Sequence, residues 1–395
     1  MTVVFWISVA VVAYVYLAYP ALLHAWARLR PAPFVSSHEA TPGVSIVIAA
    51  RNEGPRLAAR IDNLLHLDYP ADRRQIIIVC DGCSDGTHDV LEGYADTVEV
   101  VTLPPSGKAL SLNAGVAHAR FDTVVFADAR QAFAPDALRE LVAPFADPTV
   151  GGVTGELLLD CESALFANRR THADRRHGAP SPIQSAAADR RHDEDRRTIL
   201  STIADGVGVY WRYEKQLRRL ESTVGSTVGA TGAIYALRRA LWRPLPADTL
   251  LDDVLAPMRA VMAGSRVVFS EHAHAFDRAT VDADAESRRK VRTLAGNYQI
   301  LWLEPALLLP WHNPVWLQYV SHKLGRLAVP YAMLTIFVAS IVLSDRAFYS
   351  AALWGQVAFY LLAGYGAVLE LTSRVRESTR HARVVSSHTT AQEAS

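Results

Sequence analysis

Residues 44–54 read VSIVIAARNEG, a run of β-branched residues that ends in polar residues and a glycine. Residues 44–48 have the length and composition of a buried strand, and residues 55–66 are amphipathic at helical spacing. The same alternation continues, with strands predicted at 75–79, 98–102 and 123–127 and helices predicted at 84–94 and 108–119. Strands that alternate with helices predict an α/β fold, in which a mostly parallel sheet carries helices on both faces.

Polar residues follow each of these predicted strands. In an open α/β sheet, ligands bind beyond the carboxyl ends of the strands, so these residues are candidates for one shared site. A single residue of this kind would fit a turn or a helix cap. Four successive strand ends that carry carboxylates, amides or a lysine indicate a binding site instead. The candidates are Arg51, Glu53, Asp81, Asp85, Lys108, Asn113 and Asp128.

Other nucleotide and metal motifs fit poorly. The first turn after the strand predicted at 44–48, with ARNE at 50–53, lacks the glycines of a dinucleotide-binding fingerprint, so a membrane dehydrogenase is disfavoured, and NAD(H) binding would test it. Gly107-Lys108 is followed by Ala109 where a phosphate-binding Walker loop has Ser or Thr. Cys80 and Cys83 have no second pair that would complete a zinc site.

The composition divides the chain into a globular part and strongly apolar segments. Of 395 residues, 50% are hydrophobic and 20% are charged, and the mean hydropathy is +0.10. Lys+Arg and Asp+Glu both number 40, so the chain has no global basic field and no nucleic-acid partner is expected. Three cysteines in this length exclude a disulfide scaffold.

Three apolar segments, residues 2–23, 327–343 and 347–369, are candidates for membrane spans. Basic residues follow the first segment and flank the other two, and the positive-inside rule then places the N-terminus outside and the middle and tail of the chain in the cytosol. We therefore predict a multi-pass protein of a bacterial-type inner membrane with a cytosolic catalytic domain. The alternatives are a cleaved signal peptide at the N-terminus and a buried helical hairpin at the C-terminal end.

The predicted organisation has five parts: an anchor at 1–30, a cytosolic domain at 40–297, interfacial helices at 298–325, a transmembrane hairpin at 326–371 and a tail at 372–395. Within the domain, residues 160–203 are polar and contain the sequence ADRRH twice, at 173–177 and 188–192. Such a stretch buries too little apolar surface to fold, so we predict a disordered insertion. Its arginine pairs could alternatively hold anionic lipid headgroups.

Several motifs in this order resemble family 2 glycosyltransferases, most of all the membrane-bound branch that includes cellulose and hyaluronan synthases. The resemblance covers about residues 44–299, and it implies a GT-A fold, nucleotide-diphosphate sugar donors and inversion at the anomeric carbon. The motifs are SIVIAARNE at 45–53, DGCSDGT at 81–87, Lys108 with Asn113, FAD at 126–128, TGA at 231–233 and LDD at 251–253.

The resemblance assigns the donor site. Asp81 would accept a hydrogen bond from the base, which favours uracil, and Glu53 would stand close to the nucleoside. Lys108 would offset phosphate charge, and Asp128 would be the first carboxylate of the family's D-x-D motif, which holds Mg²⁺ or Mn²⁺ on the diphosphate. Arg51, Asp85 and Asn113 are assigned to substrate binding with them.

The resemblance also assigns the acceptor side of the reaction. Asp253 would be the general base that takes the proton of the acceptor hydroxyl, and Asp252 stands where the family usually has glutamate. Gly232 would form part of a closely packed acceptor wall. Arg292 would bind the diphosphate from a helix that follows the base.

Two positions depart from the family pattern. Arg130 stands where the second acid of D-x-D is expected, so one protein carboxylate is left for a metal. Residues 289–293 read RKVRT where synthases carry Q-x-x-R-W, and the missing indole removes a platform for stacking the acceptor. This loss counts against processive polymerisation.

The expected activity is therefore inverting transfer of a hexosyl or N-acetylhexosaminyl unit from a UDP-sugar in cell-envelope glycan synthesis. The acceptor would be lipid-linked or a polysaccharide, and a partner subunit could complete a pore. The alternative is a catalytically inactive scaffold of an envelope assembly complex.

Overall fold

The computed structural model of the chain describes residues 1–160, 210–278 and 283–366. The chain divides into two compact units, one of residues 19–324 and the other of residues 1–18 with the chain from 325 onward. Nearly all of the insertion predicted at 160–203, and the whole tail predicted at 372–395, lie outside the described residues.

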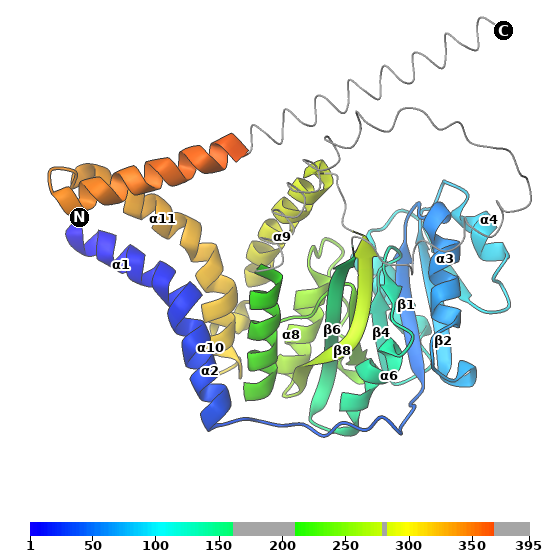
Figure 1. Cartoon of the computed structure of the whole chain (residues 1–395). Helices are drawn as coiled ribbons and strands as arrows, with labels where there is room; N and C mark the ends of the chain where they lie inside the picture. Colours follow the sequence, from blue (N-terminus) through cyan, green and yellow to red (C-terminus); the bar gives the residue numbers. More distant parts are fainter. Residues whose placement is uncertain (161–209, 279–282, 367–395) are drawn as a thin grey trace, which may run out of the picture. The chain divides into compact units, whose positions relative to one another are not determined.

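An eight-stranded sheet forms the centre of the larger unit, in the order β3-β2-β1-β4-β7-β6-β8-β5 (Figure 1). The strands β1 to β4 pair in parallel with one another, as the alternation of strands and helices predicts. Beyond β4 the sheet is mixed, because β7 runs antiparallel to both β4 and β6, whereas β6 and β8 are parallel. The strands are β1 Val44–Ala50, β2 Arg74–Asp81, β3 Glu99–Leu103, β4 Thr123–Ala127, β5 Ala132–Phe133, β6 Val150–Asp160, β7 Ile234–Arg238 and β8 Arg266–Arg278.

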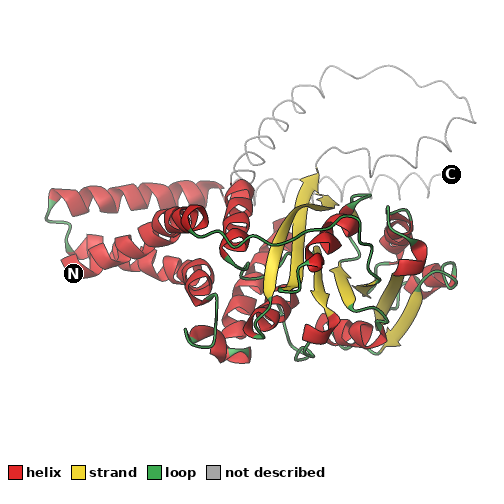
Figure 2. Ribbon diagram, turned by 90° about the horizontal axis from the view of Figure 1, so that it is seen from below, coloured by secondary structure: helices red, strands yellow, loops and turns green. Residues whose placement is uncertain are grey.

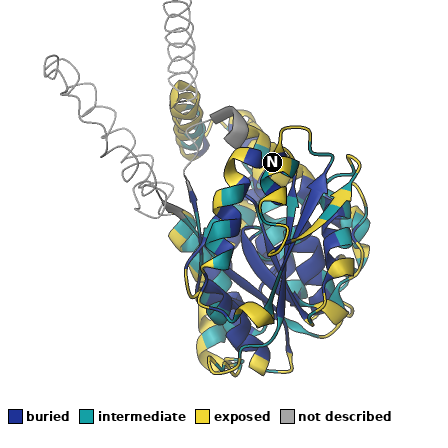
Figure 3. Ribbon diagram, turned by 90° about the vertical axis from the view of Figure 1, so that its right-hand side faces the viewer, coloured by how far each residue is buried: buried dark blue, intermediate teal, exposed yellow. Residues whose placement is uncertain are grey.

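Helices cover both faces of this sheet, which confirms the predicted α/β architecture. Alternate residues of a strand point to opposite faces, and β1 shows the result. Ile46 and Ile48 pack in one core with helices α3 and α6, and Val47 packs in the other core with α5 and α8. The buried residues of both cores are dark blue in Figure 3. The helices of this unit are α2 Tyr19–Leu29, α3 Gly54–Leu65, α4 Thr87–Glu92, α5 Lys108–His118, α6 Ala137–Val142, residues 210–224, α8 Asp252–Met262, α9 Ala283–Leu303 and α10 Trp316–Gln318.

Some elements differ from the sequence prediction in extent. Helix α4 begins at Thr87 rather than at 84, because Gly82 and Gly86 have positive φ and keep the preceding segment in a loop. Residues 298–303, predicted to start a separate interfacial helix, form the last turns of the 21-residue helix α9.

Three helices are long and apolar enough to cross a membrane: Thr2–Leu29, Trp316–Val342 and Ala347–Gly366 (Figure 2). In the smaller unit, α1 (Thr2–Ala13) packs against α11 (Gly325–Val342), and Phe5 lies among Ala339 and Tyr349. The phenyl ring of Phe5 meets the ring of Tyr349 edge-on with centroids 5.0 Å apart. These apolar helices indicate that the protein associates with a membrane.

Candidate active site

Asp81 lies at the carboxyl end of β2 and holds the loop that leads into α5. Its side chain is almost fully buried and accepts hydrogen bonds from the backbone N–H groups of Ser106 and Gly107, the latter at 3.0 Å from each carboxylate oxygen. Gly107 has φ 90°, a conformation that glycine adopts without strain. Arg51, at the end of β1, approaches the same carboxylate with its Nη1 4.0 Å from Oδ2. The contact with residues 106–107 fixes the start of α5 and therefore the position of Lys108.

Lys108 joins two carboxylates that are far apart in the sequence. Its Nζ lies 3.2 Å from Oδ1 of Asp128, at the end of β4, and 3.2 Å from Oδ1 of Asp252, at the start of α8. The side chain of Asp252 is 6% exposed, whereas those of Lys108 and Asp128 are 34% and 28% exposed. Lys108 therefore connects three elements at the sheet edge where ligands of this fold class bind.

The charges of this cluster shift one another's pKa values. Burial alone would lower the pKa of Lys108, but Asp128, Asp252 and Asp253 together raise it above its ordinary value. Burial alone would raise the pKa of Asp128, but the neighbouring charge of Lys108, helped by Arg130 and Arg292, lowers it. Lys108 is thus held as an ammonium and Asp128 as a carboxylate.

The pKa of Asp253, the residue that follows Asp252, shifts in the opposite direction to that of Asp128. Burial, then the neighbouring charge of Asp252, raise the pKa of Asp253 to about 6, against the lowering effect of Lys108 and Lys323. Its carbonyl accepts a hydrogen bond from the N–H of Ala230 at 2.7 Å. A side chain at Gly232 would place its Cβ 3.0 Å from Oδ2 of Asp253, so only glycine leaves this carboxylate its present space. Gly232, predicted to form an acceptor wall, lies directly against Asp253.

The loops after β1 and β2 are tied together. Asp85 accepts hydrogen bonds from the N–H groups of Gly54, at 3.3 Å, and Thr87, at 3.2 Å, and from the Thr87 hydroxyl. The hydrogen bond from the Thr87 side chain is the main reason that the pKa of Asp85 is lowered. Glu53 precedes α3 and pairs with Arg56 at 3.4 Å. Glu53 and Asp85 therefore belong to one loop pair beside β1 and β2.

Asn113 is placed differently from the other predicted residues. Its side-chain amide donates to the carbonyl of Leu245 and accepts from the N–H of Leu245, both at 2.8 Å. This pair of bonds fastens the middle of α5 to the segment that precedes α8. The structure thus gives Asn113 a link to the loop before Asp252 and Asp253.

Two residues in this region were not singled out from the sequence. Asn52 has φ 56°, and its side chain accepts a hydrogen bond from the N–H of Ser84 at 2.9 Å. Asparagine tolerates this left-handed conformation better than most residues do, so an asparagine directly after the strand could have indicated this turn from the sequence. Tyr235 on β7 donates to Oδ2 of Asp252 at 3.4 Å, and burial, then Asp252, raise its pKa well above the ordinary value. Nothing in the sequence around Tyr235 indicates this contact.

The residues present fit a divalent cation only in part. Among the described residues, no three His, Cys, Asp or Glu side chains converge so as to hold a metal ion. Oδ1 of Asp128 pairs with Lys108, and Oδ2 makes no ion pair with another described residue. A metal here would therefore need oxygen atoms of a bound diphosphate and water beside Asp128, as Mg²⁺ commonly has.

The charged cluster lies at the carboxyl ends of the strands, where ligands bind in an open α/β sheet. The family model described as "Glycosyltransferase like family 2" matches residues 42–296. The chain belongs to glycosyltransferase family 2, and it is a glycosyltransferase by class.

Individual glycosyltransferases are also similar to this chain in sequence or in fold. The chain is 29% identical over 140 residues to the poly-beta-1,6-N-acetyl-D-glucosamine synthase of Staphylococcus epidermidis, a match that covers 34% of each chain. It is 35% identical over 95 residues to "Probable glycosyltransferase YdaM" of Bacillus subtilis, covering 22% of this chain and 23% of that one. The matched segments thus span about a third or less of these relatives. The fold is similar to that of the mannosyltransferase PcManGT from Pyrobaculum calidifontis, solved with GDP-Man and Mn²⁺, with a TM-score of 0.66, 20% identity and coverage of 91% and 92%.

Proposed function

We propose that this protein is an inverting, membrane-bound glycosyltransferase that moves a sugar from a UDP-sugar to a lipid-linked or polysaccharide acceptor in cell-envelope glycan synthesis. The observation that carries the proposal is the bridge from Asp128 through Lys108 to Asp252, with Asp253 beside it. This arrangement supports a site in which a diphosphate and a general base face the same reacting carbon.

The donor would lie along the ends of β1, β2 and β4. Asp81 with Arg51, and the loop pair that carries Glu53 and Asp85, would hold the nucleoside. The Mn²⁺ and GDP-Man named for PcManGT support a nucleotide-diphosphate sugar as the donor class. The preference for uracil rests on the resemblance of the Asp81 motif.

The diphosphate would lie close to Lys108 and Arg292. Asp128 would hold Mg²⁺ or Mn²⁺ together with phosphate oxygens, and such an ion stabilises negative charge on a departing diphosphate. Lys108 and Arg292 would offset the same charge from the protein side, and Arg292 already contributes to the lowered pKa of Asp128. Asn113 would act indirectly, because its amide holds Leu245 and the loop before α8.

Asp253 would act as the general base. Its carboxylate takes the proton of the acceptor hydroxyl, the hydroxyl oxygen bonds to the anomeric carbon from the face opposite the diphosphate, and the bond to the diphosphate oxygen breaks with its electron pair. A base with a pKa of about 6 is largely ionised at neutral pH and still basic enough to accept a proton. Asp252, bound to Lys108 and Tyr235, would position Asp253 and keep the charges of the cluster in place.

The proposed location is the inner membrane, with several spans and a cytosolic catalytic unit. The three apolar helices and the basic residues that flank them in the sequence support this orientation. A partner subunit would be needed only if the product is a polymer that must cross the membrane.

One observation favours the inactive scaffold as a second candidate. Arg130 replaces the second acid of the metal motif, and the described residues contain no ready-made metal cluster. The test is to incubate the purified full chain with membrane lipid, Mg²⁺ or Mn²⁺, and a panel of UDP-sugars with GDP-mannose as comparison. Release of UDP and a glycosylated lipid in the mass spectrum support the enzyme, whereas nucleotide binding without either product supports the scaffold.

A further inference from the structure

One arginine is buried against the segment that leads from Asp128 to β5. Arg60 lies on α3 and is 3% exposed, and its Cζ lies 4.2 Å from the centroid of the ring of Phe133, the last residue of β5. Asn63, also on α3, binds both backbone groups of Phe133. Its Nδ2 donates to the carbonyl at 2.9 Å, and its Oδ1 accepts from the N–H at 2.8 Å. The guanidinium is therefore fixed beside the end of the segment that begins at Asp128.

The charge of Arg60 is not paired inside the protein. Within the described part of the chain, Arg60 makes no ion pair, and its one side-chain hydrogen bond runs from Nη1 to Oδ1 of Asn63 at 2.7 Å. Its Nε and Nη2 are buried without a hydrogen-bond partner. Burial lowers the pKa of Arg60 to about 9, against the raising effect of Asp128, so the group is still a cation at neutral pH.

Packing alone gives no reason for a charge at this position. Burying a cation without an anionic partner is unfavourable, and a buried group that lacks partners calls for an explanation outside the core. Removal of the guanidinium would leave no polar group of Asn63 unpaired, because Oδ1 keeps the hydrogen bond from the N–H of Phe133. An apolar side chain of similar length would therefore fit this core at least as well.

The unpaired charge acts on the candidate donor site. Arg60 comes from α3, which packs in the core on one face of the sheet, whereas Lys108 comes from α5, which packs on the other face. Lys108 lies 3.2 Å from Asp128, and Arg60 lies against the segment that follows Asp128. The end of β4 thus has a cation on each side. A buried charge is screened less by solvent than an exposed one, so it acts over a longer distance.

We propose that Arg60 is an electrostatic positioning residue of the donor site, where its buried charge attracts the diphosphate of the nucleotide sugar. The same charge would stabilise the electron pair that the diphosphate takes when its bond to the sugar breaks, and a charge already fixed in place does so without rearrangement. The inference rests on the proposed transferase function, which places the diphosphate beside Asp128.

The test compares three ligands that share a nucleoside and differ in charge. Uridine, UMP and UDP are titrated by calorimetry onto the full-length chain in detergent micelles at one fixed Mg²⁺ concentration. The variants are Arg60→Met and Arg60→Gln, which remove the charge, and Arg60→Lys, which keeps it. Arg74→Met is the matched control. Arg74 is a half-buried arginine at the start of β2, at the end of the strand opposite Asp81, and its Nη2 donates to the carbonyl of Leu65 at 3.1 Å.

We expect the loss of affinity to follow the charge of the ligand. UDP should bind about tenfold more weakly to Arg60→Met and Arg60→Gln, UMP should lose less, and uridine should bind as it does to the wild type. Arg60→Lys should recover most of the affinity for UDP, and Arg74→Met should keep it. The unfolding midpoint of Arg60→Met should equal or exceed that of the wild type, because an unpaired buried charge has been removed.

Two results would overturn the proposal. One is an equal loss of uridine and UDP binding in the neutral variants, which would mean that the site has been distorted. The other is unchanged UDP binding in both neutral variants, or UDP binding by Arg60→Lys as weak as by Arg60→Met, since charge would then have no effect.

These measurements need no turnover, so they stand apart from the test of the transferase itself. A wild-type chain that shows the charge-dependent loss but releases no UDP from any UDP-sugar would refute the proposed function and leave Arg60 as a nucleotide-binding determinant. Sugar transfer by a chain whose UDP affinity does not depend on Arg60 would support the function and refute the role of Arg60.

Discussion

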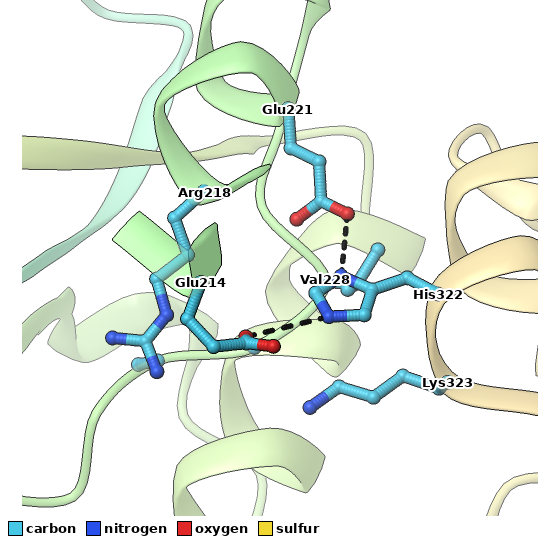
Figure 4. Close-up of a pocket in the computed structure, with 8 residues that line it drawn as sticks. Glu214, Arg218, Glu221, Val228, His322 and Lys323 are labelled. Carbon is cyan, nitrogen blue, oxygen red and sulfur yellow. Dashed lines mark hydrogen bonds and ion pairs between the residues drawn. The ribbon is translucent and has the colours of Figure 1, made fainter. Parts of the chain in front are cut away.

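Two clusters of the larger unit place one nitrogen-bearing side chain between two carboxylates, and the charged groups beside them differ. At the sheet edge, Lys108 joins Asp128 and Asp252, and the additional group is the carboxylate of Asp253. In a small recess that Arg218 and Lys323 line, His322 lies 2.7 Å from Glu221 and 3.6 Å from Glu214 (Figure 4). The group beside each bridge therefore differs: a carboxylate with a raised pKa in the first cluster, and an arginine and a lysine in the second.

The largest expected effect comes from removing the carboxylate of Asp253, which lies beside the bridge of Lys108. Asp253→Asn should lower kcat by about 10²- to 10⁴-fold, the usual contribution of a general base, and should leave UDP binding intact. Sugar transfer and nucleotide binding are measured on the same preparation. Asp122→Asn is a suitable control, because that exposed aspartate pairs with Arg239 at the opposite end of β4. Turnover close to wild type in Asp253→Asn would show that another group accepts the proton.

The two bridging side chains should differ in their effect on stability. Lys108→Met leaves Asp252, whose side chain is 6% exposed, without its charged partner and should lower the free energy of unfolding by about 3 kcal/mol, although solvent screens the second pair with Asp128. His322→Gln removes the 2.7 Å contact of Nδ1 with the fully buried Glu221 and should cost less, about 1–2 kcal/mol. Thermal unfolding of the detergent-solubilised variants measures the difference. The reverse order would mean that Asp252 does not depend on its pair with Lys108.

The raised pKa of Asp253 predicts opposite responses of activity and stability to pH. The base must be ionised, so kcat/KM should rise with pH through a midpoint near 6. The folded protein holds this proton more tightly than the unfolded chain does. The stability that comes from the proton is therefore fully present below pH about 4 and is lost as the pH rises through about 6. A pH–rate profile with no acidic limb near 6 would contradict the assignment.

The smallest effect is expected from restoring the second acid of the metal motif. Arg130→Asp adds a carboxylate close to Asp128 and should tighten Mn²⁺ binding in the presence of UDP on the order of tenfold, because affinity follows the charge of the ligand set. Calorimetric titration with and without UDP measures the change. Arg139→Asp is the control with the same change of charge, at a residue that pairs with Asp68 at 3.0 Å. Equal metal affinity in wild type and Arg130→Asp would mean that residue 130 does not face the ion.

The parallel half of the sheet was predictable because its strands are continuous β-branched runs separated by amphipathic helices. The observed β1, β2, β3 and β4 all fall within two residues of the predicted segments. The half of the sheet that contains β6 and β8 was not predicted from the sequence. Strand β6 contains three glycines, at 151, 152 and 155, and β8 has an irregular register against it, so neither shows a regular period. A short apolar segment at 298–303 also reads the same whether it begins an interfacial helix or ends a long one.

The candidate site, like the sheet, was predictable from the sequence only in part. Residues at strand ends could be predicted because the topology of an α/β sheet brings those ends to one edge, and two of them, Lys108 and Asp128, lie 3.2 Å apart. The contact of Tyr235 with Asp252 and the recess around His322 were not found, because their partners come from segments up to about two hundred residues apart with no shared motif.

The resemblance to the family, the alternating architecture and the charged residues at the strand ends could be predicted without coordinates, because they depend on local periodicity and on which side chains follow each strand. How the charges are shared became known from the folded chain. The pairing of Lys108 with Asp252 rather than Asp253, and of His322 with two glutamates, depends on burial and on distances between elements. Those quantities exist only when the chain is folded, and they leave the carboxylate of Asp253 outside the pairs that Lys108 makes.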